Sequence, residues 1–97
     1  MCTIQLNKIL SSGLNLPDAG NNLYERIKQQ SECNEKVIID MTDVTSLSSV
    51  FLNTSIGRII DEKGINFLKE NISFIKITRQ QAERLKEYLS KYKGWPD

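Results

Sequence analysis

Apolar and polar residues follow two different periods along this chain. Over residues 3–10, Ile4 and Leu6 alternate with polar neighbours, which is the two-residue period of a strand with one buried face. Residues 37–39 and 72–77 are apolar or nearly apolar runs rich in β-branched side chains, which is typical of strands covered on both faces in a parallel sheet. We therefore expect an outer strand at 3–10, a central strand at 37–39 and a second interior strand at 72–77.

Three segments carry apolar residues at the three- and four-residue spacings of a helix. The first follows Asn22, which with Glu25 forms a cap pattern; the second ends at Gly64; the third begins at the capping box of Thr78 and Gln81. The expected buried stripes are Leu23 and Ile27, then Leu52, Ile56, Ile59 and Ile60, then Ala82, Leu85, Leu89 and Tyr92.

The segment between the first strand and the first helix is rich in turn residues, and within it Leu14 and Leu16 are expected to form a short hairpin strand. Strand and helix then alternate, and right-handed crossovers make the strands at Val37 and Ile72 parallel neighbours. We expect one α/β domain over residues 1–97, a small sandwich of about four strands in a mixed, mainly parallel sheet with three helices.

The charge and the residue composition of the chain exclude several classes of partner and activity. The formal net charge is +1 with no basic block, so neither nucleic acid nor a membrane surface is an expected partner. No apolar run approaches the length of a membrane span and the start lacks signal-peptide features, so we expect a cytoplasmic protein. The chain has no His, and Cys2 and Cys33 have no zinc-site spacing. We expect two free thiols, no metal, no cofactor and no enzymatic activity.

The polar turn after the central strand carries a family resemblance. Its residues are Asp40, Met41, Thr42, Asp43, Val44, Thr45, Ser46, Leu47, Ser48, Ser49 and Val50. This order resembles a STAS domain, in which a strand ending in Asp leads to an Asp-Ser-Ser-Gly motif that opens a helix. It is more similar still to the bacterial STAS-like domain-of-unknown-function family, where a Ser run followed by Phe and Leu replaces that motif, as at 48–52. The similarity continues through Gly57, Arg58 and the strand at 72–77.

The resemblance implies a small STAS-like sandwich that acts as a regulatory protein-interaction module similar to an anti-sigma factor antagonist. The implied partner is a histidine-kinase-like ATPase or a sigma-factor regulator, bound through the surface around residues 45–53. The implied partner-binding residues are Asp40, Asp43, Thr45, Ser46, Ser48, Ser49, Val50, Phe51 and Asn53. Aligned without a gap, Val50 takes the place of the family's phosphate-accepting Ser, which leaves Ser49 as the candidate phosphoacceptor.

Other interpretations of the same residues stay open. Ser48 or Ser49 can be a helix cap alone. Asp40 and Asp43 can be a carboxylate pair that binds Mg²⁺ or takes part in acid–base chemistry. In the plainer interpretation, Asp40 accepts hydrogen bonds from backbone amides of the turn and Asp43 is solvated. Two further function classes remain: a small-ligand or anion-binding domain that uses the helix start at 48–51, and a homo-oligomeric module whose exposed sheet edge pairs with itself.

Overall fold

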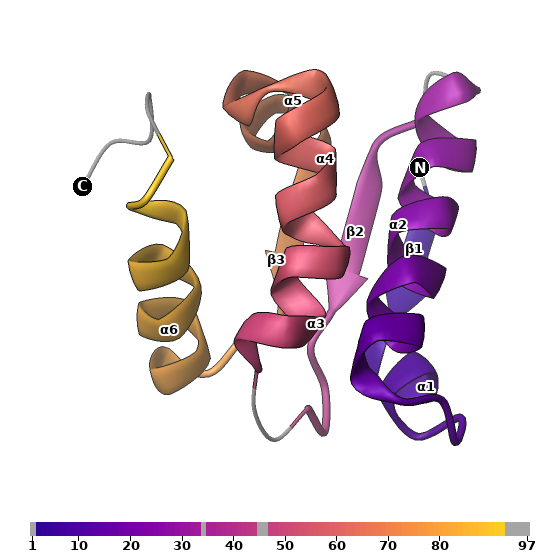
Figure 1. The fold of residues 1–97 in the computed structure, drawn as a ribbon, viewed down its shortest axis with the longest axis vertical. Helices are drawn as coiled ribbons and strands as arrows, with labels where there is room; N and C mark the ends of the chain where they lie inside the picture. The colour runs from indigo at the N-terminus through magenta and orange to yellow at the C-terminus, as the bar shows by residue number, and fades with distance from the viewer. Residues whose placement is uncertain (1, 34, 45–46, 93–97) are drawn as a thin grey trace.

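The computed structural model describes residues 2–33, 35–44 and 47–92, and it shows helices packed on a parallel sheet (Figure 1). The elements are β1 (Cys2–Gln5), α1 (Leu6–Leu10), α2 (Leu16–Glu32), β2 (Val37–Asp40), α3 (Ser49–Thr54), α4 (Ile56–Lys63), α5 (Ile65–Asn71), β3 (Ile72–Ile75) and α6 (Arg79–Leu89). The strand order is β1-β2-β3, and both pairs are parallel. The α/β class is confirmed, whereas the expected four strands, mixed sheet and three helices are not matched in the described residues.

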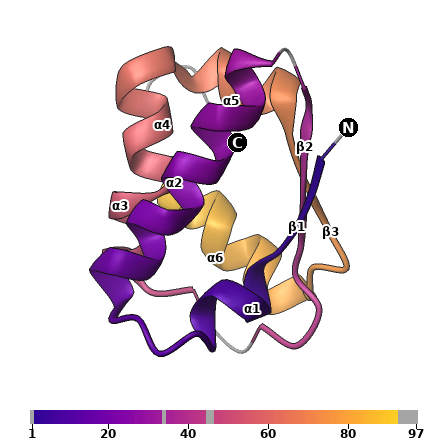
Figure 2. The ribbon, with the colours of Figure 1, turned by 90° about the vertical axis from the view of Figure 1, so that its right-hand side faces the viewer.

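The strands confirm the central position of β2 and its parallel pairing with β3. The expectation of strands covered on both faces is wrong, because the helices all lie on one side of the sheet (Figure 2). Ile39 is fully buried toward the helices, while Ile38 is half-buried and Ile75 is 38% exposed on the outer face. β3 is an edge strand rather than an interior one. A continuous apolar run therefore does not show whether helices cover one face of a strand or both faces.

The beginning of the chain differs from the expectation in two respects. The first strand stops at Gln5 and residues 6–10 form α1, because Leu6 and Ile9 reach the core at a helical spacing of three. No strand contains Leu14 or Leu16 in the described chain: α2 begins at Leu16, capped by Asn15, with a Pro in its first turn. Side-chain capping and a first-turn Pro both favour a helix start. The helix therefore begins six residues before the expected cap at Asn22.

The expected helix that carries the stripe from Leu52 to Ile60 is divided in two at Ser55. Its buried stripe is confirmed, but Ser55 has φ −121° and ψ −85°, and its hydroxyl donates to the Phe51 carbonyl at 2.7 Å. α4 ends at Lys63, and Gly64 follows it with a φ of +89°, a conformation that favours glycine. The chain then forms α5, which the sequence pattern did not predict.

The last helix follows the expected capping box, which is formed by Thr78 and Gln81 as predicted. Leu85 and Leu89 are buried and Tyr92 is half-buried, but Ala82 is exposed and Tyr88 takes the remaining core position. The buried side of α6 is thus displaced by about one residue from the expected stripe, toward Gln81 and Tyr88.

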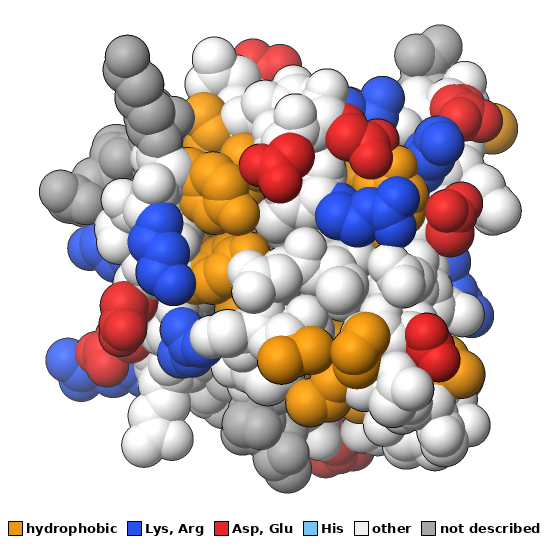
Figure 3. Space-filling view, viewed as in Figure 1, with side chains coloured by type: hydrophobic (Ala, Val, Ile, Leu, Met, Phe, Trp, Pro, Cys, Tyr) orange, Lys and Arg blue, Asp and Glu red, His pale blue; other side chains and the backbone are white. Residues whose placement is uncertain are grey.

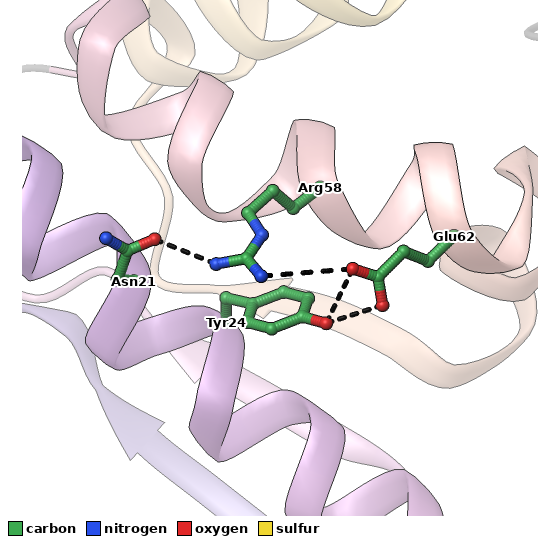
Figure 4. A network of polar contacts seen from close by, with 4 residues as sticks. All are labelled: Asn21, Tyr24, Arg58 and Glu62. Atoms are coloured by element: carbon green, nitrogen blue, oxygen red, sulfur yellow. Dashed lines mark hydrogen bonds and ion pairs between the residues drawn. The ribbon is translucent and has the colours of Figure 1, made fainter.

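Close packing joins α2 to the helices that follow β2. A Cβ at Gly20 would lie 1.7 Å from the Thr54 hydroxyl oxygen and 2.8 Å from the Phe51 carbonyl, so α2 and α3 meet where no side chain intervenes. One turn further along α2, polar contacts link it to α4 (Figure 4).

In that link, the Tyr24 hydroxyl donates to the Glu62 carboxylate at 2.5 and 2.7 Å. The Arg58 guanidinium lies 3.7 Å from the centroid of the Tyr24 ring and donates to the Asn21 side chain at 2.9 Å. Together with the Gly20 contact, these interactions fix the orientation of α3 and α4 on the sheet. They therefore fix the direction in which the loop after β2 must run.

Candidate functional site

The loop between β2 and α3 begins with a carboxylate that is engaged inside its own turn. Asp40 is 8% exposed, and one of its oxygens accepts the Thr42 amide at 2.9 Å and the Thr42 hydroxyl at 2.6 Å. The hydroxyl, then the amide, holds the pKa of the Asp40 carboxyl below its ordinary value; burial acts in the opposite direction, and Lys76, 4.0 Å away, adds a smaller lowering. Asp40 therefore shapes the turn, as the plainer interpretation expected.

Asp40 and Asp43 line one polar hollow of about 210 Å³ at the carboxyl ends of β1 and β2. The other lining residues are Gln5, Asn7, Lys8 and Thr42. Asp43 is exposed and has φ +62°, which Asp tolerates better than most residues. Within the described residues, no group of three or more acidic or cysteine side chains is placed to hold a metal ion.

Ser48 is the residue that caps α3. Its hydroxyl accepts the Phe51 amide at 3.1 Å, which satisfies one of the free amides of the first turn. Loss of such a cap typically costs about 1 kcal/mol. α3 has only six residues, and the Phe51 amide of its first turn already donates to Ser48. No observation on the described residues therefore favours the anion-binding alternative.

Three side chains of α6 contact successive positions of the loop and α3; we call these contacts the α6 seam. The Gln81 side-chain amide donates to the Val44 carbonyl in a buried hydrogen bond. Arg84 donates to the Ser49 hydroxyl at 2.6 Å. The Tyr88 hydroxyl donates to the Asn53 side-chain oxygen at 2.7 Å. The seam therefore connects residues that lie 35 to 37 positions apart in the sequence.

The seam ends in a close contact between α6 and α4. A Cβ at Gly57 would lie 2.5 Å from the Tyr88 hydroxyl oxygen and 3.0 Å from that of Tyr92. Burial, followed by the hydrogen bond with Tyr92, raises the pKa of Tyr88 far above its ordinary value. Tyr88 therefore stays a neutral hydrogen-bond donor, and it holds Asn53 in place at the end of α3.

The structure separates the predicted partner-binding residues into three groups. Asp40 and Asp43 line the hollow, whereas Ser48, Ser49, Val50 and Asn53 belong to the beginning and outer side of α3. Phe51 is 2% exposed and belongs to the core. Thr45 and Ser46 lie outside the described residues.

An apolar surface lies where α3 meets the beginning of α2, near the bottom of the molecule in Figure 3. Val50 is 46% exposed on α3, and Leu16 is 43% exposed in the first turn of α2. Ser49 and Asn53 are exposed polar residues on the same helix as Val50. We call Ser49, Val50, Asn53 and Leu16 the α3 surface.

The local sequence pattern did not predict the part that α6 takes in this site. Gln81 was recognised as a capping residue, but its second hydrogen bond, to a carbonyl 37 residues earlier, has no local signal. The contact of Arg84 with Ser49, 35 residues earlier, likewise has no local signal. The spacing of Gln81, Arg84 and Tyr88 places all three on one side of a helix, and that was the available signal.

A family model described as "STAS-like domain of unknown function (DUF4325)" matches residues 19–91 of the 97-residue chain. The chain belongs to this STAS-like family. The match confirms the resemblance that the loop residues suggested. No significant match was found among curated proteins or solved structures. In the described part of this STAS-like domain, no helix has the length and apolar character needed to cross a membrane.

The Asp40 turn predicts a specific pH dependence. Replacing Thr42 with Val removes the hydroxyl that lowers the pKa of Asp40 most, so the pKa should rise toward the ordinary value of ~3.9. Lys76→Gln should raise this pKa less. NMR titration of the Asp40 carboxyl carbon measures both changes.

The sign of the stability effect follows from the same pKa. Because the folded-state pKa is lower than the unfolded one, the stabilisation from Asp40 is complete above ~3.9 and is lost as pH falls through the folded value. In this acidic range the free energy of unfolding should fall more steeply for wild type than for Thr42→Val. An Asp40 that titrates at its ordinary value in wild type would contradict this account of the turn.

Proposed function

We propose that this STAS-like domain is a non-enzymatic regulatory module that binds a partner protein through the surface around residues 45–53. The observation that carries the proposal is the exposure of Val50. A valine that is 46% exposed in the first turn of a short helix contributes little to the fold, but it offers apolar area to a partner.

The surroundings of Val50 support a preformed protein-binding surface. Leu16 adds a second exposed apolar side chain, while Ser49 and Asn53 supply polar groups on the same helix. Ser48 caps α3, and the α6 seam holds Ser49 and Asn53 from the other side. A surface held in this way loses little conformational entropy when it binds.

The STAS-like family supports the class of partner. Its resemblance to anti-sigma factor antagonists favours a histidine-kinase-like ATPase or a sigma-factor regulator. A non-enzymatic role is favoured by the lack of His, the commonest general base, in the chain and by the engagement of the Asp40 carboxylate with Thr42. The family description names no activity, so the partner class is part of the proposal.

Affinity capture tests the proposed surface. Immobilised wild-type protein should retain a histidine-kinase-like ATPase or a sigma-factor regulator from a native extract, identified by mass spectrometry. Val50→Glu should retain far less of the same protein, because it places a charge in the apolar contact while leaving the core unchanged.

The matched control is Gln29→Glu, which adds the same side chain at an exposed position of α2 away from the α3 surface. It should retain as much partner as wild type does. Failure of wild type to retain either class of protein, or equal retention by Val50→Glu, would count against the proposal.

We further propose Ser49 as the site of regulation by phosphorylation. It is exposed at the first position of α3, beside Val50, and its hydroxyl already lies 2.6 Å from the Arg84 guanidinium. A phosphate would add about −1.5 to −2 charges there, which Arg84 can pair with and an apolar partner surface cannot.

Incubation of the retained kinase and ATP with the purified domain tests this role. Wild type and Ser90→Ala, which alters another exposed serine, should incorporate phosphate, and Ser49→Ala should not. Equal incorporation into all three proteins, or incorporation into none, would remove Ser49 as the acceptor.

A further inference from the structure

An apolar groove separates α6 from the outer edge of β3, with which no strand of the described residues pairs. Its volume is about 430 Å³, within the range of ligand-binding clefts. Most of its lining is apolar, and its charged lining residues are both lysines. The lining consists of Leu68, Lys69, Ile72, Phe74, Ile77, Ala82, Leu85, Lys86 and Leu89. The groove uses a side of α6 different from the one that forms the α6 seam, so it is distinct from the α3 surface.

The helix layer extends beyond the sheet at this edge. In Figure 1, β1 lies behind α2 and β3 lies behind α4, but no strand of the described chain lies behind α6. Figure 2 shows α6 on the same side of the sheet as the other helices. Neighbouring strands are about 4.8 Å apart, whereas packed helices are about 8–10 Å apart. One more strand beside β3 would therefore lie beneath α6, where the groove is.

The backbone of β3 is oriented to accept such a strand. The Ile75 carbonyl accepts the Met41 amide at 3.0 Å, so Ile75 turns its backbone groups toward β2. Alternate residues of a strand in a parallel ladder direct these groups to opposite sides. The N–H and C=O of Phe74 therefore face away from β2, at the groove.

The geometry points to an extended segment of a partner protein that pairs with β3 and inserts its apolar side chains beneath α6. One side of the added strand faces Leu85 and Leu89, so the segment carries an apolar residue at every second position. Lys86 also lines the groove, so an acidic side chain in the segment complements its ammonium group.

A second copy of the chain fits this edge poorly. If two β3 strands paired antiparallel about a two-fold axis, both helix layers would lie on the same side of the joined sheet. Each α6 already projects past β3, so the two copies of α6 would compete for the space above the new strand pair. A single strand that brings no helix of its own avoids this conflict, which selects a peptide segment over self-pairing.

Selection from a random twelve-residue peptide library on the immobilised wild-type protein tests the inference. Enriched peptides should carry alternating apolar residues and an acidic residue. Their affinity should fall by about tenfold or more for Lys86→Glu, an exposed change in the groove, and should stay unchanged for Lys8→Glu, on α1 next to the opposite edge strand.

A second measurement separates strand pairing from side-chain contact alone. Binding of an enriched peptide should slow hydrogen exchange of the Phe74 amide, which faces away from β2. A library that yields no binder, peptides that bind Lys86→Glu as well as wild type, or an unchanged Phe74 exchange rate would overturn the inference. Val50→Glu should bind these peptides normally, so this result is independent of the proposed function.

Discussion

The buried side-chain amide of Gln81 is the interaction on which the arrangement of this domain depends most. Its oxygen accepts the Thr78 amide and thereby starts α6, while its nitrogen donates to the carbonyl of Val44 in the loop after β2. Both groups lie where water has little access, since Gln81 is 5% exposed and Val44 is 7% exposed. Leaving such a carbonyl without a donor costs about 1–3 kcal/mol. One side chain therefore both caps the start of α6 and ties α6 to the loop after β2.

The helix that Gln81 caps, α6, supports two different surfaces. From Gln81 onward, one side of the helix holds the loop and α3 through Arg84 and Tyr88, while another side forms the wall of the groove beside β3. The proposed partner surface and the proposed strand-binding edge are thus supported by the same helix. A change in the position of α6 would alter the partner surface and the strand-binding edge together, although each has its own contacts.

Local patterns were enough to predict the elements whose signals lie within a few residues. The capping box at Thr78, the glycine at the end of α4 and the buried stripe of residues 52–60 all follow from short-range chemistry, and each is present. The loop residues likewise indicated the family correctly. These features depend on backbone capping and helical period, which a single sequence displays directly.

The features that were missed depend on tertiary context. Residues 4–6 have a spacing of two that suits a strand, yet Leu6 enters a helix because it packs into the core together with Ile9. The break falls at Ser55, which is neither proline nor glycine, so the residue at the break gives no clear sequence signal. Whether one face or both faces of the sheet are covered is decided by where the helices pack, and the partners of Gln81 and Arg84 lie far away in sequence.

Hydrogen exchange in a Gln81→Glu variant tests the central role of Gln81 most directly. Glutamate keeps the size and the oxygen needed for the capping box, but it removes the donor to Val44. The amides of Val44, Leu47 and Ser49 should then exchange faster together with those of α6, while β1 stays unchanged and the neighbouring exposed control Gln80→Glu behaves as wild type. Faster exchange confined to α6, with the loop unaffected, would contradict this account.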